Sequence, residues 1–329
     1  MTKEKYSWVK IDSEQWAQWE MLVANSKQGT IFSRRDFLES AGVKYELHFV
    51  LKGKEIKAGV CVIRSSDATK CELDDLVIHS GLLFKYDDTK KAVRRNFEHF
   101  EITEFVVEKL AKQYCSISMA LSPYSDDLRP FLWHNYHDSN ANSKFVVDLR
   151  YTTYIDISGL SGTSSELETA TYKAMDASRR RHVKDAKKNG AKVLVTKNID
   201  RLVKQYERLM TTQGDPVSVS KLSRMKNLMQ YLTDSDQGSV YEVRNKSDLV
   251  VYTAFYAWDE KRAYYLFGAP SETNNEAWQG TIAHWEAFMD ISRRDVVEID
   301  MEGINSPKRG WFKLGFGGCL VPYYHVHKG

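Results

Sequence analysis

The stretch VVEIDMEGINSPKRGWFKLGFGG, residues 296–318, decides how the rest of this 329-residue chain is interpreted. It opens as an apolar run typical of a buried β-strand, and the run ends in two carboxylates, Asp300 and Glu302. A Gly/Asn/Ser/Pro segment follows, and Trp311, Phe312 and Lys313 then lead into three glycines. Acidic side chains at a strand end beside a glycine-rich segment indicate a functional site. The alternative from these residues alone is a β-bulge hairpin that closes the core.

Length and composition set the protein class. A chain of 329 residues fits two domains of ordinary size. Its 42% hydrophobic and 28% charged residues are those of a soluble globular protein, and a net charge of +3 argues against a dominant nucleic-acid surface. No apolar run is long enough to cross a bilayer and no signal-peptide pattern follows Met1, so we expect a cytoplasmic protein without a membrane partner.

The cysteines do not form a recognisable metal motif. They lie far apart along the chain, without ligand spacing, so we expect reduced, mostly structural thiols and no metal site; the four are Cys61, Cys71, Cys115 and Cys319. A catalytic cysteine remains the alternative.

Hydrophobic periodicity predicts the same order of elements in the two halves of the chain. The first half reads as helices (16–23 and 31–38), a hairpin (47–51 and 56–63), a strand (73–84), a helix (97–112) and a strand (116–121). The second half reads as helices (199–213 and 221–232), a hairpin (239–244 and 249–258), a strand (262–267), a helix (278–292) and a strand (296–301). This repeat predicts an α/β (α+β) fold with an internal duplication, each half a mixed sheet flanked by helices. The core stripe expected for the 97–112 helix is Phe97, Ile102, Phe105, Val106 and Leu110.

A basic segment lies between the two halves. After a strand at 154–158, residues 172–189 read as one helix that Asn189 and Gly190 end. Residues 173–192 hold eight Lys or Arg and two Asp. Such a run is either a solvated helix face or a patch for phosphates or RNA.

Together with the ending Phe-Lys-x-Gly-Phe-Gly-Gly, the basic segment resembles the Fem-type transferases. The matching positions are Ser178, Arg179, Arg181, Lys184, Ala186, Lys187, Asn189 and Gly190. These enzymes have tandem acetyltransferase-fold (GNAT-like) domains and put an aminoacyl or acyl group on an amine of a nucleotide-linked acceptor. The resemblance covers about residues 30–316. It implies an acceptor-side domain of residues 1–152 with 318–329, and an acyl-donor domain of residues 153–317.

One departure from the family narrows the expected function. No heptad-patterned helical arm of the kind found in some aminoacyl-tRNA-dependent members occurs in the sequence. Family members that lack this arm have a compact form. They include cell-wall peptide transferases and acyl-CoA-dependent N-acyltransferases of nucleotide-linked amino sugars.

The reaction expected from the resemblance is aminolysis of an activated ester, which needs a base for the amine and a dipole for the oxyanion. The candidate bases are His79, Asp300 and Glu302. His79 has the most suitable unperturbed pKa, with a structural histidine as the alternative. Asp300 and Glu302 alternate along a strand and should share one face. By resemblance, Lys313 lies near the reacting ester, with a surface lysine as the alternative. Tyr264 and Tyr265 alternate along a strand, so one of them should face the cleft and donate a proton to the leaving group, and Tyr265 is the candidate.

Two further groups of residues are expected to bind the substrates. Residues 268–281 lead into a helix whose N-terminus favours the phosphates of the acyl carrier. The expected carrier-binding residues are Gly268, Gln279, Gly280 and Thr281, with a polar helix cap as the alternative. By resemblance, the diphosphate of the acceptor is bound by Arg35, Lys221 and Arg224.

The expected function is transfer of an acyl group from acyl-CoA, as co-substrate, to the amino group of a dTDP- or UDP-linked aminodeoxy sugar for surface polysaccharide (O-antigen or capsule). A first alternative is an aminoacyl-tRNA-dependent transferase acting on a nucleotide-linked muropeptide. A second is a non-catalytic GNAT-like binding module. The sequence leaves the oligomeric state open.

Overall fold

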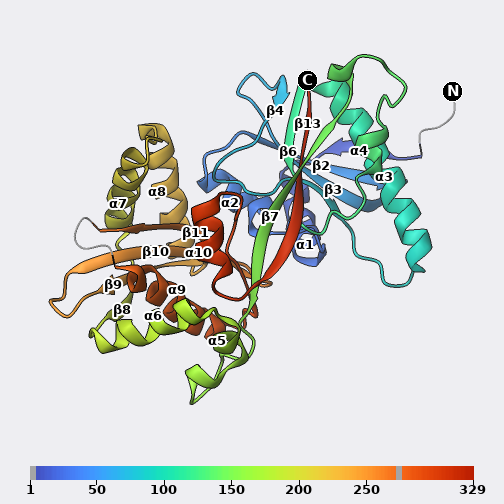
Figure 1. Cartoon of the computed structure of the whole chain (residues 1–329). Helices are drawn as coiled ribbons and strands as arrows, with labels where there is room; N and C mark the ends of the chain where they lie inside the picture. The colour runs from blue at the N-terminus through green and yellow to red at the C-terminus, as the bar shows by residue number, and fades with distance from the viewer. Residues whose placement is uncertain (1–4, 272–275) are drawn as a thin grey trace. The chain divides into compact units, whose positions relative to one another are not determined.

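The chain forms two compact units. The computed structural model describes residues 5–271 and 276–329. Unit 1 comprises Met1–Arg150 and Pro322–Gly329, and unit 2 comprises Tyr151–Val321. Figure 1 shows their helices and strands.

Unit 1 contains a four-stranded antiparallel sheet in the order β1-β2-β3-β5, and a second group in which β6 pairs with β4 and β13. Its strands are β1 (Ser7–Lys10), β2 (Tyr45–Lys52), β3 (Glu55–Ile63), β4 (Lys70–Cys71), β5 (Gly81–Phe84), β6 (Ser116–Ala120) and β13 (Cys319–Lys328). Its helices are α1 (Trp16–Asn25), α2 (Arg35–Ser40), α3 (Ala92–Gln113) and α4 (Arg129–Trp133). Helix α3 buries Ile102, Val106 and Leu110, which recur at helical spacing.

Unit 2 contains a mixed sheet in the order β7-β12-β11-β10-β9-β8. Its strands are β7 (Val146–Asp156, which enters unit 2 at Tyr151), β8 (Lys192–Thr196), β9 (Gly238–Arg244), β10 (Val250–Trp258), β11 (Ala263–Pro270) and β12 (Glu298–Asp300). Helices α7 and α8 cover one face of this sheet, and α6 and α9 cover the other (Figure 1). The helices are α5 (Ala170–Ala174), α6 (Ala177–Lys188), α7 (Ile199–Thr212), α8 (Val219–Asp234), α9 (Ala277–Ile291) and α10 (Pro307–Leu314).

The order of elements repeats between the units. In unit 1 a strand, two helices and a hairpin precede β5, α3, β6 and α4. In unit 2 the same order precedes β11, α9, β12 and α10. Strand β7, which follows α4, pairs with β12 of unit 2, whereas β13, which follows α10, pairs with β6 of unit 1. The α/β class and the mixed sheets flanked by helices, expected from the sequence, are confirmed.

Several local expectations are wrong. The basic helix is interrupted at Met175 and Asp176, because Asp176 takes an extended conformation and caps the separate helix α6. Of residues 73–84, only 81–84 form a strand. Phe97 is 68% exposed because it precedes the part of α3 that packs on the core. Trp311, Phe312 and Lys313 lie on helix α10, so the alternative of a β-bulge hairpin is wrong.

No helix among residues 5–271 and 276–329 combines the length and apolar character needed to span a membrane.

The start of α6 provides a test of the local structure. The carboxylate of Asp176 accepts hydrogen bonds from the backbone N–H groups of Ser178 at 2.6 Å and Arg179 at 3.0 Å. Asp176→Ala should therefore lower the free energy of unfolding by about 1 kcal/mol, measured from urea denaturation. Asp176→Asn, which keeps an oxygen acceptor at the cap, should lose less. Equal losses in the two variants would contradict this account.

Candidate active site

Strands β11 and β12 separate after a very short parallel pairing. Only two residue pairs are in register, Ala263 with Ile299 and Tyr264 with Asp300, although β11 continues to Pro270. On its other side β11 pairs with β10, and the register shifts so that Leu266 has no opposing residue. Beyond Tyr264 the edge of β11 is therefore not paired with β12, and the sheet opens at this point.

A cavity of about 670 Å³ lies in unit 2 beside this opening. It is lined by residues of α7, β10, β11, α9 and α10. These include Tyr206, Met210, Tyr252, Tyr265, Gly268, Ala277, Gly280, Lys308, Arg309, Trp311, Phe312 and Lys313. At two lining positions a glycine lets an aromatic side chain pack directly against the backbone. A Cβ on Gly268 would lie 2.2 Å from Tyr265 Oη, and one on Gly280 would lie 3.3 Å from the Phe312 ring.

Aromatic rings and one arginine form a wall of the cavity. The hydroxyl groups of Tyr252 and Tyr265 are 3.3 Å apart. The guanidinium of Arg179 lies 4.3 Å from the centre of the Phe312 ring and donates a hydrogen bond to Thr281 Oγ1 at 3.2 Å. Arg179 thus links α6 to both α9 and α10, with its charge over an aromatic face, an arrangement that stabilises a partly desolvated cation.

Lys313 links the cavity to the turn that follows β12 and carries Glu302. Its Nζ lies 5.1 Å from the centre of the Tyr265 ring and donates to the backbone oxygens of Glu302 at 3.2 Å and Gly303 at 3.3 Å. Burial lowers the pKa of Lys313 to about 8, although Glu302 and Asp300 oppose this shift. The amine can therefore exchange a proton near neutral pH.

The two carboxylates are buried next to each other. Asp300 Oδ1 accepts from Thr152 Oγ1 at 2.5 Å and from the backbone N–H of Glu302 at 2.8 Å. Burial raises the pKa of Asp300 to about 6. Burial, and then the charge of Asp300, raises the pKa of Glu302 well above its usual value. Within the described part of the chain, neither carboxylate oxygen of Glu302 has a hydrogen-bond partner.

The backbone of Glu302 differs from the sequence-based expectation. Strand β12 ends at Asp300, and Glu302 has a φ of 57°, in the left-handed region that side chains with a Cβ rarely adopt. The two acids therefore do not project from one face of a continuous strand. They are close because the chain turns sharply, and a buried acid held in this conformation is a feature that functional sites share.

His284 is a buried group that the sequence did not indicate. It lies on α9, its Nδ1 is 2.6 Å from Tyr256 Oη, and its ring contacts that of Tyr265 at 4.5 Å between centres. Burial lowers the pKa of His284 to about 3, so the ring is neutral. By packing against Tyr265, the ring supports this wall of the cavity.

The predicted site residues fall into two groups. Six lie together in unit 2, in the cavity or directly behind Lys313: Tyr265, Gly268, Gly280, Asp300, Glu302 and Lys313. Gln279 and Thr281 are buried on other faces of α9 and do not line the cavity. Part of the predicted 268–281 segment, residues 272–275, lies outside the described residues.

The remaining predicted residues lie elsewhere. In unit 1, His79 is buried with its ring edge-on to Phe32 and Tyr323, at 5.9 and 5.1 Å between centres. Arg35 of α2 pairs with Asp36 and Glu39, and its guanidinium lies over the Trp16 ring. Lys221 and Arg224 lie on α8 of unit 2 and do not line the cavity. The roles expected for these four residues stay predictions.

No group of three or more His, Cys, Asp or Glu side chains suited to a metal ion occurs among the residues that the structure describes.

Sequence reasoning missed Arg179 and His284 as parts of the site. Arg179 stands among exposed cations of α6, and only its contacts with other elements, such as those with Phe312 and Thr281, distinguish it. His284 lies in a helix buried on nearly all sides, where hydrophobic periodicity marks no special face.

The whole chain is similar in structure to several solved proteins. FemX has a TM-score of 0.65 at 10% identity, over 97% of this chain and 96% of that one. The C-terminal domain (DUF2156) of a putative lysylphosphatidylglycerol synthetase from Agrobacterium fabrum has a TM-score of 0.56 at 10% identity, over 96% and 92%. A tandem GNAT protein from the clavulanic acid biosynthesis pathway has a TM-score of 0.53 at 9% identity, over 98% and 97%.

These likenesses show the fold, which consists of two tandem GNAT-like domains. No protein-family model matches the sequence, and no curated protein matches it.

The raised pKa of Asp300 predicts a pH-dependent effect on stability. Between about pH 4 and pH 6 the folded protein holds a proton on this group that the unfolded chain releases, so rising pH destabilises the fold. Asp300→Asn removes this loss of stability with rising pH. The free energy of unfolding of the variant, relative to the natural protein, should rise by roughly 1 to 3 kcal/mol across that window.

Urea denaturation at several pH values between 4 and 8 measures the effect. A constant difference between the two proteins across this range would show that Asp300 titrates normally in the folded state.

Proposed function

We propose that this protein is an N-acyltransferase that moves an acyl group from acyl-CoA to the amino group of a nucleotide-linked aminodeoxy sugar. The observation that carries the proposal is the cavity beside the separated strands β11 and β12, with Lys313 and the buried acids at one side. A tandem GNAT-like fold is consistent with transfer chemistry at such an opening.

The cavity has the features needed to bind a thioester carrier. The backbone edge of β11 can pair with an extended amide-containing chain such as pantetheine. The first turn of α9 faces the cavity through Ala277 and Gly280, and its N–H groups suit phosphate oxygens. Lys308 and Arg309 add positive charge, and Trp311, 77% exposed, offers a flat surface for a base.

In the proposed reaction the neutral amine attacks the thioester carbonyl. A tetrahedral oxyanion forms, and the C–S bond then breaks to release the thiolate. Glu302 is a suitable acceptor for the proton lost by the amine, because its raised pKa gives the carboxylate useful basicity. Lys313 stabilises negative charge near the carbonyl. The Tyr265 hydroxyl gives its proton to the sulfur of the leaving group and regains the proton that Glu302 took from the amine, so that both residues end in their starting states.

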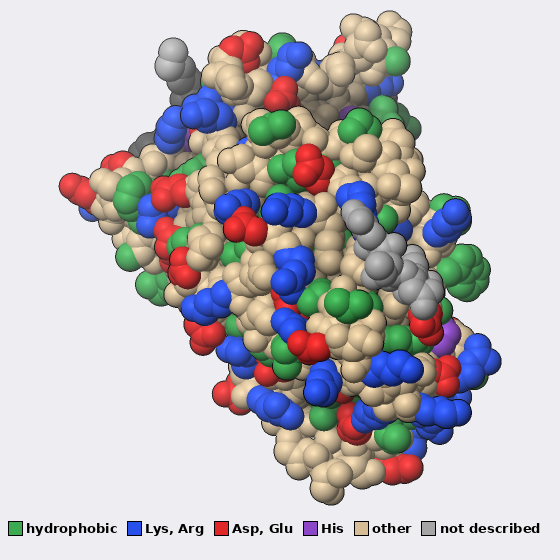
Figure 2. All heavy atoms as spheres, turned by 90° about the vertical axis from the view of Figure 1, so that its left-hand side faces the viewer, with side chains coloured by type: hydrophobic (Ala, Val, Ile, Leu, Met, Phe, Trp, Pro, Cys, Tyr) green, Lys and Arg blue, Asp and Glu red, His purple; other side chains and the backbone are tan. Residues whose placement is uncertain are grey.

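Charge distribution supports a small nucleotide-linked acceptor over a large nucleic acid. The net charge is +3, and in Figure 2 Lys and Arg side chains are interspersed with Asp and Glu on the face shown. Extensive contact with RNA phosphates requires a broad basic surface.

One observation favours the aminoacyl-tRNA alternative. Helix α6 exposes Arg181, Lys184, Lys187 and Lys188, which form a local basic strip, although Lys187 pairs with Glu166. The similarity to FemX is compatible with this function but shows the fold only.

Thermal denaturation with added ligands tests the donor class. A ligand that binds only the native state stabilises it by mass action, by roughly 2.7 kcal/mol at one hundred times its Kd. We expect coenzyme A and acyl-CoA to raise the Tm, and a dTDP- or UDP-amino sugar to raise it further. No shift with any coenzyme A species, together with a shift by aminoacyl-tRNA, would move the protein to the alternative function.

Turnover by site variants tests the assigned roles. Lys313→Ala and Glu302→Gln should each lower kcat roughly 100-fold, because one removes a charge near the oxyanion and the other removes the base. KM for the acyl donor should change little.

The matched controls are Lys184→Ala and Glu168→Gln, exposed residues of unit 2 that do not line the cavity. If the site variants turn over as fast as these controls, the site assignment is wrong.

A further inference from the structure

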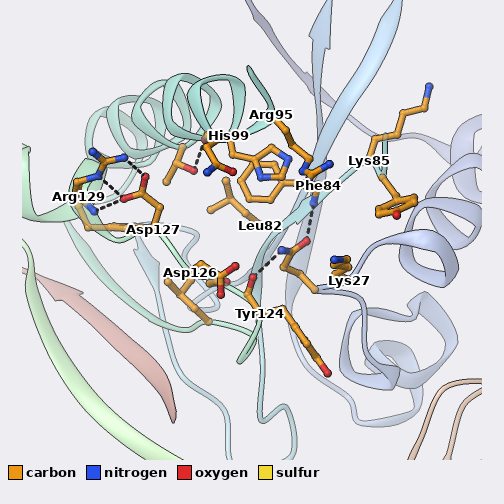
Figure 3. Close-up of a pocket in the computed structure, with 17 residues that line it drawn as sticks. Lys27, Leu82, Phe84, Lys85, Arg95, His99, Tyr124, Asp126, Asp127 and Arg129 are labelled. Atoms are coloured by element: carbon orange, nitrogen blue, oxygen red, sulfur yellow. Dashed lines mark hydrogen bonds and ion pairs between the residues drawn. The ribbon is translucent and has the colours of Figure 1, made fainter. Parts of the chain in front are cut away.

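Unit 1 contains a cavity of its own, with a volume of about 410 Å³ (Figure 3). It is lined by residues that follow α1, residues of β5 and α3, and residues that follow β6. Those used in the argument are Lys27, Gln28, Phe84, Arg95, His99 and Asp127. None of them belongs to the site proposed in unit 2.

The position of this cavity in unit 1 matches that of the donor cavity in unit 2. In unit 2 the lining comes from α7, β11, α9 and α10. Their counterparts in the repeated order are α1, β5, α3 and α4. The unit 1 cavity is lined by residues just after α1, along β5, along α3 and at the start of α4. Strands β5 and β6, the counterparts of β11 and β12, pair in separate sheets, so the opening is complete.

Two cations face the unit 1 cavity without an acidic partner among the described residues. Arg95 of α3 donates only a weak hydrogen bond, to the backbone oxygen of Asp87 at 3.5 Å. Lys27 lies over the ring of Tyr86, with Nζ 5.7 Å from its centre. Figure 3 shows both side chains near Phe84, while Lys85 points away.

The acids of the cavity do not cancel these two charges. Asp127 is held by Arg129 through two hydrogen bonds, of 2.8 and 2.6 Å. Asp126 is exposed and lies across the cavity from Arg95 and Lys27 in Figure 3. The part of the cavity around Arg95 and Lys27 therefore remains positive, which favours an anion.

The same side carries a flat, rigid wall. The rings of Phe84 and His99 stack with 3.9 Å between centres and an angle of 7°. Burial lowers the pKa of His99 to about 4, so this wall is uncharged at neutral pH. Gln28 fixes it in place, since its side chain accepts from the backbone N–H of Phe84 at 3.3 Å and donates to the backbone oxygen of Tyr124 at 2.8 Å. An aromatic surface beside unpaired cations suits a flat ring that carries a phosphate.

We propose that the cavity of unit 1 is a second ligand site, related by the repeat to the donor cavity, that binds a nucleoside phosphate with its phosphate on Arg95 and Lys27 and its base against Phe84. This deepens the proposed function and rests on it where the nucleotide is borne by the acceptor, but binding of the nucleotide can be measured without acyl transfer. The nucleotide is either free or the nucleotide part of a larger substrate, and the two sources share this chemistry.

Calorimetric titration of the full chain with UMP, UDP, AMP, uridine and pyrophosphate tests the proposal. We expect nucleotides to bind more tightly than uridine or pyrophosphate alone. Arg95→Glu and Lys27→Glu should each weaken nucleotide binding roughly tenfold or more, because each reverses a phosphate contact. Phe84→Leu should weaken nucleotides but not pyrophosphate.

Arg94→Glu is the matched control, because it makes the same charge change on the same helix at a residue that does not line this cavity. Circular dichroism and Tm establish that the variants fold. Saturating coenzyme A should not displace the nucleotide, since the donor cavity is separate. A UDP-amino sugar that binds more tightly than UDP at the same residues would identify a substrate-borne nucleotide, and equal affinity would identify a free one.

Three results would overturn the proposal. The first is the absence of binding by any nucleotide. The second is binding that Arg95→Glu and Lys27→Glu leave unchanged relative to Arg94→Glu. The third is displacement by coenzyme A, which would assign the nucleotide to the cavity of unit 2.

Discussion

The early separation of two parallel strands is the constraint on which the arrangement of unit 2 depends. Strands β11 and β12 share two paired residues, and beyond these the backbone of β11 must find other partners or face a cavity. Helices α9 and α10 frame that space, and α10 places Lys313 against the turn that follows β12. A longer strand pairing would close the cavity and remove the position from which Lys313 meets the acids.

Buried charge gives this region its chemical character. Three ionisable groups, Lys313, Asp300 and Glu302, share a desolvated space that disfavours charge, so the two acids hold their protons more tightly than in water and the lysine holds its proton less tightly. Such a cluster destabilises the fold unless its charges are balanced, so a protein retains it at some cost. The tight left-handed turn at Glu302 adds to that cost. Both features suit the proton transfer proposed above, and neither is needed for core packing.

Hydrophobic periodicity was enough to predict the repeated order of elements, because each helix and strand buries one face of its own sequence. It could not predict that Glu302 leaves the strand, since a positive φ at a residue other than glycine arises from tertiary contacts. The sequence pattern could not single out His284, because α9 is buried on several sides and its hydrophobic pattern marks no special face. The unit 1 cavity draws on four separate parts of the chain, so no local pattern marks it.

The pairing of β13 with β6 has a consequence for biosynthesis. Residues 325–328 complete the strand group of unit 1, whose other members lie within the first 120 residues. During synthesis, the edge of β6 that pairs with β13 therefore stays unpaired while all of unit 2 is made. Domains usually fold in order from the N-terminus. Here the first unit to emerge from the ribosome is the last to be finished, and β6 is exposed to mispairing until then.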